Sequence, residues 1–146
     1  MTTMNGHSTI TEALSKRDAR TDWQRCRNWI KDAVKYNGGT HTIEDIETAI
    51  EAGKMQFWPG EKCAAVTECA EYPRKKVFNI TLAGGDMKEL LQMIPSFASF
   101  AAYLGASEMA VAGRPGWERI LRGWKKGLVV LTTPVSGALK GEQPIQ

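Results

Sequence analysis

The spacing of apolar residues changes along the chain, and this change limits the folds that the sequence can adopt. Apolar residues recur on one helical face over residues 20–36 and again over residues 43–50. Between residues 54 and 84 they follow the two-residue period of strands instead. Helical and strand patterns then alternate toward the C-terminus. This order predicts an α/β (α+β) protein with a mixed, mostly antiparallel central sheet flanked by helices.

Two helices are expected before the first strand. The first covers about residues 20–36 and meets a strong stop signal at Asn37, which two glycines follow. The second helix follows Thr42, and Asp45 stands three residues later, which is the pattern of a capping box. Gly53 closes this second helix.

Three strands are predicted next, and turn residues separate them. They cover residues 54–60, 63–72 and 76–84. In the third strand Phe78, Ile80 and Leu82 are expected to share one face, because side chains alternate between the two faces of a sheet.

A long helix is expected after the third strand, over about residues 86–104. Pro95 lies inside it and removes one backbone donor, so the helix should be kinked there. The last predicted elements are a strand over residues 107–113, a helix over 114–126 and a strand over 127–133.

The 146 residues suffice for one domain with a buried core, and 42% hydrophobic with 24% charged residues is typical of a soluble globular protein. We place this domain at residues 20–133, between a polar N-terminal arm at 1–19 and a C-terminal tail at 134–146. No apolar run is long enough to cross a membrane, and the N-terminal residues lack the apolar core of a signal peptide. The sequence therefore predicts neither a membrane span nor secretion by a cleaved signal.

Charge and cysteine content give no support to two further classes of function. The net charge of +3 comes from 19 basic and 16 acidic residues spread along the chain, which is too mixed to indicate nucleic-acid binding. Cys26, Cys63 and Cys69 have no Cys-x-x-Cys spacing, and both histidines lie far away in sequence. Buried free thiols are therefore expected rather than disulfides or a metal site.

The stretch NITLAGGDMKELLQ, residues 79–92, is the strongest candidate for a binding site. A strand runs into Gly84 and Gly85, and Asp86 then opens the following helix. A Gly-Gly turn before a helix N-terminus can hold the phosphate of a cofactor. The same residues also fit a simple turn in which Asp86 is an N-cap, which would stabilise the helix by about 0.5–2 kcal/mol.

From about Ile43 to Thr133 the element order resembles the Gcn5-related N-acetyltransferase (GNAT) fold. The matching segments are the junction LAGGDMKELL and the closing unit MAVAGRPGWERILRGWKKGLVVLTT. The resemblance implies that acetyl-CoA would place its pyrophosphate at the junction, with Gly84 and Gly85 as the cofactor-binding residues. The phrases WPGEKCAAVTE, LAGGDMKEL and AGRPGWERIL also resemble a small protein of tailed bacteriophages in acetyltransferase-like form.

Several positions depart from the GNAT pattern. The family's cofactor loop begins with Gln or Arg, which is missing upstream of the glycines, and Asp86 places an anion where the diphosphate would lie. The tyrosine that serves the family as general acid would fall at Leu121 or Arg122. The asparagine that ends the family's fifth core strand would fall at Gly113 or Arg114. The carboxylates Glu68 and Glu108 are candidate bases without an identifiable partner, so no residue is assigned as catalytic.

Two features are candidates for protein contacts. Trp58 stands at a strand end before a Pro-Gly turn, where tryptophan is often partly exposed. Arg74, Lys75 and Lys76 form a basic cluster at a hairpin, which fits a solvated turn or an acidic partner. The resemblance to phage proteins implies a virion-associated component in the neck, the tail or the ejection apparatus, located in the virion or the host cytoplasm and contacting other virion proteins.

Two alternatives to this non-catalytic function stay open. One is a CoA-dependent N-acetyltransferase with an atypical cofactor loop at Gly84 and Gly85. The other is a small adaptor that binds nucleic acid or an acidic partner through residues 74–76.

Overall fold

The structure is a computed structural model that describes the backbone of residues 5–113 and 116–140, and side chains from residue 19 onward. The chain divides into two compact units, Met1–Arg114 and Pro115–Gln146. This boundary differs from the one expected at residue 133.

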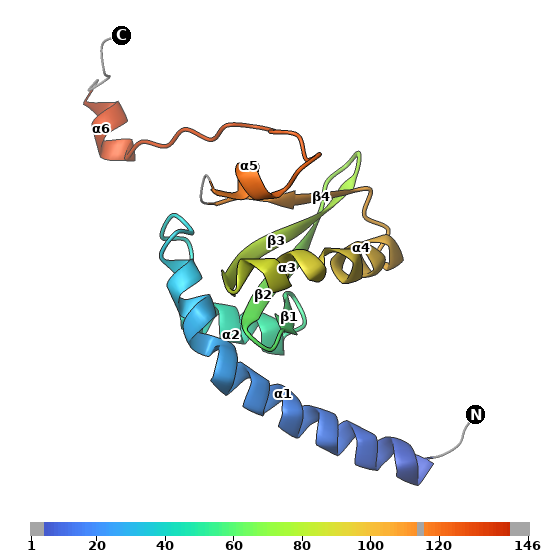
Figure 1. Ribbon diagram of the computed structural model, residues 1–146. Coiled ribbons are helices and arrows are strands. Elements are labelled where there is room, and N and C mark those ends of the chain that lie inside the picture. The colour runs from blue at the N-terminus through green and yellow to red at the C-terminus, as the bar shows by residue number, and fades with distance from the viewer. Residues whose placement is uncertain (1–4, 114–115, 141–146) are drawn as a thin grey trace. The chain divides into compact units, whose positions relative to one another are not determined.

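The first unit contains a four-stranded sheet and the helices that pack on it (Figure 1). Its elements are α1 (Asn5–Val34), α2 (Ile43–Glu51), β1 (Gln56–Pro59), β2 (Cys63–Glu71), β3 (Lys76–Gly85), α3 (Met87–Gln92), α4 (Ile94–Tyr103) and β4 (Glu108–Val111). The second unit contains the short helices α5 (Gly116–Ile120) and α6 (Val135–Leu139).

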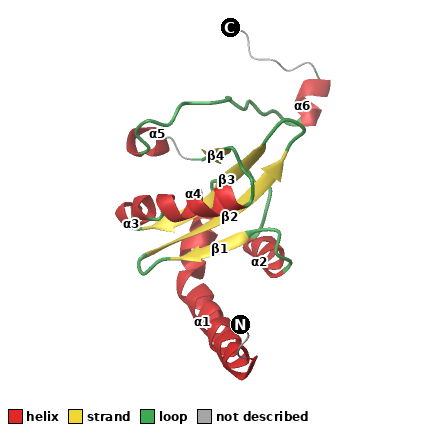
Figure 2. Cartoon of the chain, turned by 90° about the vertical axis from the view of Figure 1, so that its right-hand side faces the viewer, coloured by secondary structure: helices red, strands yellow, loops and turns green. Residues whose placement is uncertain are grey.

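The strands lie in the order β1-β2-β3-β4. The first two pairs are antiparallel, and β3 pairs with β4 in parallel. Figure 2 shows this sheet between helices. The predicted fold class, a mixed and mostly antiparallel sheet flanked by helices, is confirmed.

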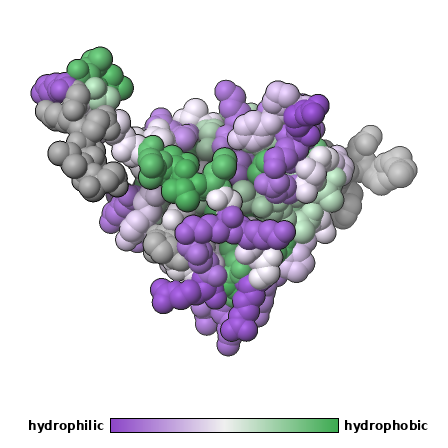
Figure 3. Space-filling view, turned by 90° about the horizontal axis from the view of Figure 1, so that it is seen from above, coloured by the Kyte–Doolittle hydropathy of each residue, from purple (hydrophilic) through white to green (hydrophobic). Residues whose placement is uncertain are grey.

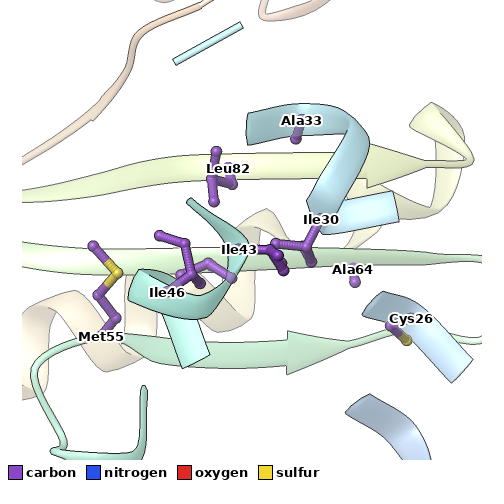
Figure 4. Packing of buried hydrophobic residues seen from close by; sticks show 9 residues of the cluster. Cys26, Ile30, Ala33, Ile43, Ile46, Met55, Ala64 and Leu82 are labelled. Atoms are coloured by element: carbon purple, nitrogen blue, oxygen red, sulfur yellow. The ribbon is translucent and has the colours of Figure 1, made fainter. Parts of the chain in front are cut away.

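Helices α1 and α2 cover one face of the sheet and α4 covers the other. Phe57 contacts Trp23 of α1, with ring centroids 5.0 Å apart, whereas its neighbour Trp58 contacts Phe97 of α4 at 4.9 Å. Because adjacent strand residues point to opposite faces, the two helices lie on opposite sides. The core on the α1 side consists of Cys26, Ile30, Ala33, Ile43, Ile46, Met55, Ala64, Val66 and Leu82 (Figure 4).

A polar contact joins α1 to α2 at the rim of this core. The Glu47 carboxylate accepts a hydrogen bond from the Trp23 indole at 2.6 Å and another from the Arg27 guanidinium at 3.0 Å. Both bonds hold the pKa of Glu47 below its ordinary value, the bond from Arg27 most strongly. The predicted capping box of α2 is confirmed, since Thr42 and Asp45 bond each other's backbone amides.

The prediction that Phe78, Ile80 and Leu82 share one face of β3 is wrong. Leu82 belongs to the core beneath α1, whereas the Phe78 ring contacts Phe100 of α4 at 5.9 Å. The cause is a register shift, because Val66 pairs with Leu82 while the next residue, Thr67, pairs with Ile80. The extra residue in β3 is Thr81, and such a bulge changes which face the flanking side chains reach.

Two helices differ in extent from the prediction. The helix expected over residues 86–104 is divided into α3 and α4, and Pro95 stands in the first turn of α4, where its missing N–H costs no hydrogen bond. Helix α1 begins at Asn5 rather than near Arg20, so its backbone continues into the segment interpreted as a polar arm.

The strand predicted over residues 127–133 is not present in the second unit. The described chain has neither helix nor strand from residue 124 to residue 134. A strand needs a neighbour for its backbone hydrogen bonds, and no described strand pairs with this segment. The predicted helix over 114–126 is reduced to α5, with its first two residues outside the described part, and Gly123 (φ +85°) follows it.

Candidate functional site

The junction between β3 and α3 is the candidate site, and the sheet is paired unevenly around it. β3 pairs with β4 only up to Ile80, which lies opposite Val111. On its other side β3 stays paired with β2 as far as Gly85, which lies opposite Cys63. The last part of β3, residues 81–85, therefore extends past the end of β4.

Gly84 and Gly85 are required by close backbone packing. A Cβ atom at Gly84 would lie 2.6 Å from the Trp29 carbonyl oxygen of α1. A Cβ atom at Gly85 would lie 2.6 Å from the Cys63 Cα of β2, and the φ of +96° there favours glycine. The space that a side chain would need at Gly84 or Gly85 is therefore filled by the backbone of α1 or β2.

The expected capping bond of Asp86 is absent, which corrects the sequence prediction. Asp86 occupies the N-cap position of α3 in an extended conformation, but its side chain accepts no hydrogen bond from the helix. The residue is exposed, so water can solvate the carboxylate instead. Its backbone N–H donates to the Lys62 carbonyl oxygen at 2.8 Å, which ties the start of α3 to the β1–β2 turn.

Glu89 makes the tighter connection to that turn. Its carboxylate accepts the N–H of Glu61 at 2.9 Å and the N–H of Lys62 at 2.7 Å. The amide of Lys62, then that of Glu61, holds the pKa of Glu89 below its ordinary value. In the sequence Glu89 is only an acidic residue in the first turn of a predicted helix. Its partners lie 27 and 28 positions away, and no sequence pattern indicates that they would bond to it.

The thiols beside this site are protected. Cys63 is buried, and its Sγ lies 3.5 Å from the Met93 sulfur. Burial, and then the Glu89 carboxylate, raises the pKa of Cys63 to about 12. Burial also raises the pKa of Cys26. Both thiols are therefore protonated and unreactive near neutral pH.

The candidate acid and base residues are not brought together. Glu108 forms an ion pair with Lys75 at 2.6 Å, and Glu68 lies opposite Asn79 in the sheet register. Leu121 is buried in the second unit, and Arg114 lies outside the described residues. Among the residues that the structure describes, no group of three or more His, Cys, Asp and Glu side chains could hold a metal ion.

Trp58, the candidate contact residue of β1, is half-buried. Its indole N–H donates to the Thr67 hydroxyl at 2.8 Å, and its ring contacts Phe97 and Phe100 of α4. The Phe100 ring in turn stacks with Tyr103 at 6.2 Å. A row of aromatic rings thus connects Trp58 to Tyr103, which is 82% exposed.

The basic cluster lies at the same end of the first unit as Tyr103. Lys75 pairs with Glu108, and the Lys76 ammonium donates to the Leu104 carbonyl oxygen at 3.1 Å, beside the end of α4. Arg74 is exposed, and so is Tyr72 in the same turn. We call Tyr72, Arg74 and Tyr103 the hairpin-end surface.

No helix in the described part of the chain combines the length and the apolar character needed to cross a bilayer.

Comparison with known proteins gives limited matches. No family model matches the sequence, and no curated protein matches it. Crystal structures of TTHA1254 from Thermus thermophilus, the wild type and a point mutant, are similar with TM-scores of 0.48 and 0.49. Each is 17% identical, and the similarity covers 70% of this chain and 89% of the other.

Replacing Gly84 with alanine tests whether this turn serves packing. We expect Gly84→Ala to lower the free energy of unfolding by about 1–3 kcal/mol, because the new methyl group overlaps the Trp29 carbonyl. Gly127→Ala is the matched control, since nothing lies within 4 Å of its Cβ position. Urea denaturation measures both, and equal stabilities of Gly84→Ala and wild type would contradict the packing role.

The Glu89 contact predicts a pH dependence of stability. Its folded pKa lies below the ordinary value of 4.5, so its contribution is complete above pH 4.5 and is lost as the pH falls through the folded pKa. Glu89→Gln should therefore lose less stability than wild type between neutral pH and about pH 3. Glu71→Gln, which changes an exposed carboxylate of β2, should follow the wild-type curve. Parallel curves for Glu89→Gln and wild type would show that the contact is unimportant.

Proposed function

We propose that this protein is a non-catalytic, GNAT-like protein of a tailed phage that acts through protein contacts as a component associated with the virion. The observation that supports a non-catalytic role is the packing of Gly84 and Gly85 against the backbone of α1 and β2. In a cofactor loop, glycines leave room for a phosphate to approach backbone amides. At this turn the room is taken by the chain itself.

The charges around the turn also oppose a diphosphate. Asp86 and Glu89 place two carboxylates at the beginning of α3, where a bound anion would need positive potential. The Glu89 carboxylate already accepts two backbone amides of the neighbouring turn. Helix α3 has only 6 residues, so its dipole adds little attraction. An incoming phosphate would be repelled by these two carboxylates and would find the amides of Glu61 and Lys62 already occupied, while Asp86 leaves the first amides of α3 uncapped.

The hairpin-end surface supports the second part of the proposal. Tyr72 and Tyr103 are 55% and 82% exposed, and Arg74 lies in the turn beside Tyr72. Tyrosine and arginine are the residue types that most often dominate binding energy in protein interfaces. Lys75 donates a hydrogen bond to the Glu108 carboxylate of β4, and Lys76 donates one to the Leu104 carbonyl oxygen at the end of α4. These two bonds hold the β2–β3 turn in place. A preordered surface loses less entropy on binding.

One observation favours the alternative, a CoA-dependent N-acetyltransferase with an atypical loop. Because β4 pairing stops at Ile80, residues 81–85 of β3 have no strand beside them on that side in the described chain. Backbone groups along such an edge could meet an extended ligand. The carboxylates at the start of α3 would still oppose its phosphates.

Titration with acetyl-CoA distinguishes the two functions. We expect isothermal titration calorimetry to detect no binding at micromolar concentrations, because the glycine turn is packed and the adjoining helix start is acidic. The double variant Asp86→Asn with Glu89→Gln removes both charges and serves as a comparison. Micromolar affinity of the wild-type chain for acetyl-CoA would overturn the non-catalytic function.

The contact role is tested in the particle. We expect mass spectrometry to find the chain in purified virions, and Tyr103→Ala with Arg74→Ala to reduce its copy number at least about tenfold, as loss of a contact hot spot does. Lys54→Ala, which truncates an exposed side chain between α2 and β1, is the control and should incorporate normally. Absence of the wild-type chain from virions would refute the virion role, and normal incorporation of the double variant would exclude this surface.

A further inference from the structure

The second unit carries a concentrated apolar surface. Leu128, Val129, Val130 and Leu131 are 69–97% exposed, and Val135 and Leu139 of α6 are 73% and 83% exposed. Figure 3 shows such apolar groups at the surface, in green. Large contiguous apolar patches on a soluble chain usually mark a contact surface.

The backbone of this segment is also available for pairing. The described chain forms neither helix nor strand from residue 124 to 134, and Figure 1 draws this stretch as an extended trace between α5 and α6. The β-branched residues Val129, Val130, Thr132 and Thr133 favour strands, and a run that is apolar on both faces suits a strand covered on both sides. Pro134 marks its end, since proline cannot donate to a ladder.

We propose that residues 128–131 form a strand by pairing with the same residues of a second copy, antiparallel about a two-fold axis. This inference is independent of the proposed function. A two-fold axis of an antiparallel pair passes between identical residues, and an axis at Val130 places Val130 opposite Val130 and Val129 opposite Leu131. Val129, Val130 and Leu131 then each meet an apolar residue of the other copy, and Leu128 lies opposite Thr132, so both copies use the same residues as an isologous contact does.

Charge selects the antiparallel direction. Residues 127–134 contain no charged side chain, but Lys125 and Lys126 immediately precede them. An antiparallel pair places the lysines of the two copies at opposite ends of the ladder. A parallel, in-register pair would place them side by side, where like charges repel.

The apolar area is sufficient for a specific dimer. At roughly 100 Å² of apolar surface for each side chain, the six exposed residues of two copies offer on the order of 1,000 Å². That is the size at which specific protein interfaces begin. Two strands alone are marginal in water, so Val135 and Leu139 are needed to cover the ribbon.

Sedimentation equilibrium of the full chain tests the proposal. Wild type should show a mass of twice 16.1 kDa at micromolar concentration. Val130→Lys should raise the dimer dissociation constant at least about tenfold, because it buries a charge. Val130→Pro should do the same while keeping the position apolar, because it removes a ladder donor. Ala98→Lys adds the same charge to an exposed position of α4 and should leave the dimer intact.

Other outcomes separate the possible occupants of this surface. A wild-type chain that stays monomeric throughout the concentration range would overturn pairing with a second copy, leaving another protein or a lipid surface as the occupant. A dimer that survives Val130→Pro would overturn the strand ladder. Circular dichroism of each variant should differ from wild type only by the loss of this short strand, since the segment is exposed in the single chain and the rest of the fold does not depend on it.

Discussion

The first unit depends on how closely α1 approaches the sheet at Gly84. The Trp29 carbonyl of α1 lies where a side chain of residue 84 would be, so only glycine allows this approach. The approach in turn lets Cys26 and Ile30 of the same helix reach the sheet core, where both are fully buried. The two glycines at the junction of β3 and α3 match the pattern of a phosphate-binding turn, but the packing of α1 against Gly84 explains the need for glycine there.

The bulge at Thr81 lets one strand serve two cores. Leu82, after the bulge, packs beneath α1, and Phe78, before it, joins the aromatic row beneath α4. Without the extra residue, both side chains would point to one face and one core would lose a large residue. The pairing with β4 also ends at Ile80, next to this irregularity. The bulge therefore determines the packing of β3, and the free edge of the strand begins beside it because β4 ends at Val111.

The parts of the fold that could be predicted are those that local sequence controls. The capping box at Thr42 and the stop after Asn37 lie within a few residues of the groups that they satisfy. Glu89 could not be assigned to the Glu61–Lys62 amides, because that contact depends on how α3 is placed beside the β1–β2 turn. The bulge at Thr81 is not predictable for a similar reason, since an alternating pattern does not show an extra residue in one partner strand. Residues 127–133 have the composition of a strand, but a strand exists only where a neighbour is supplied.

The amides at the β1–β2 turn show how the junction of β3 and α3 is held together without a bound ligand. Backbone N–H groups that converge on one point favour an anion, whether that anion is a phosphate or a carboxylate. Glu89 belongs to the chain, so its carboxylate is present at a high effective concentration, and an external phosphate must displace it. Once an internal carboxylate has taken such donors, the turn is held together by the chain's own charge. The strand, the glycines and the helix therefore form a junction that contacts within the chain account for.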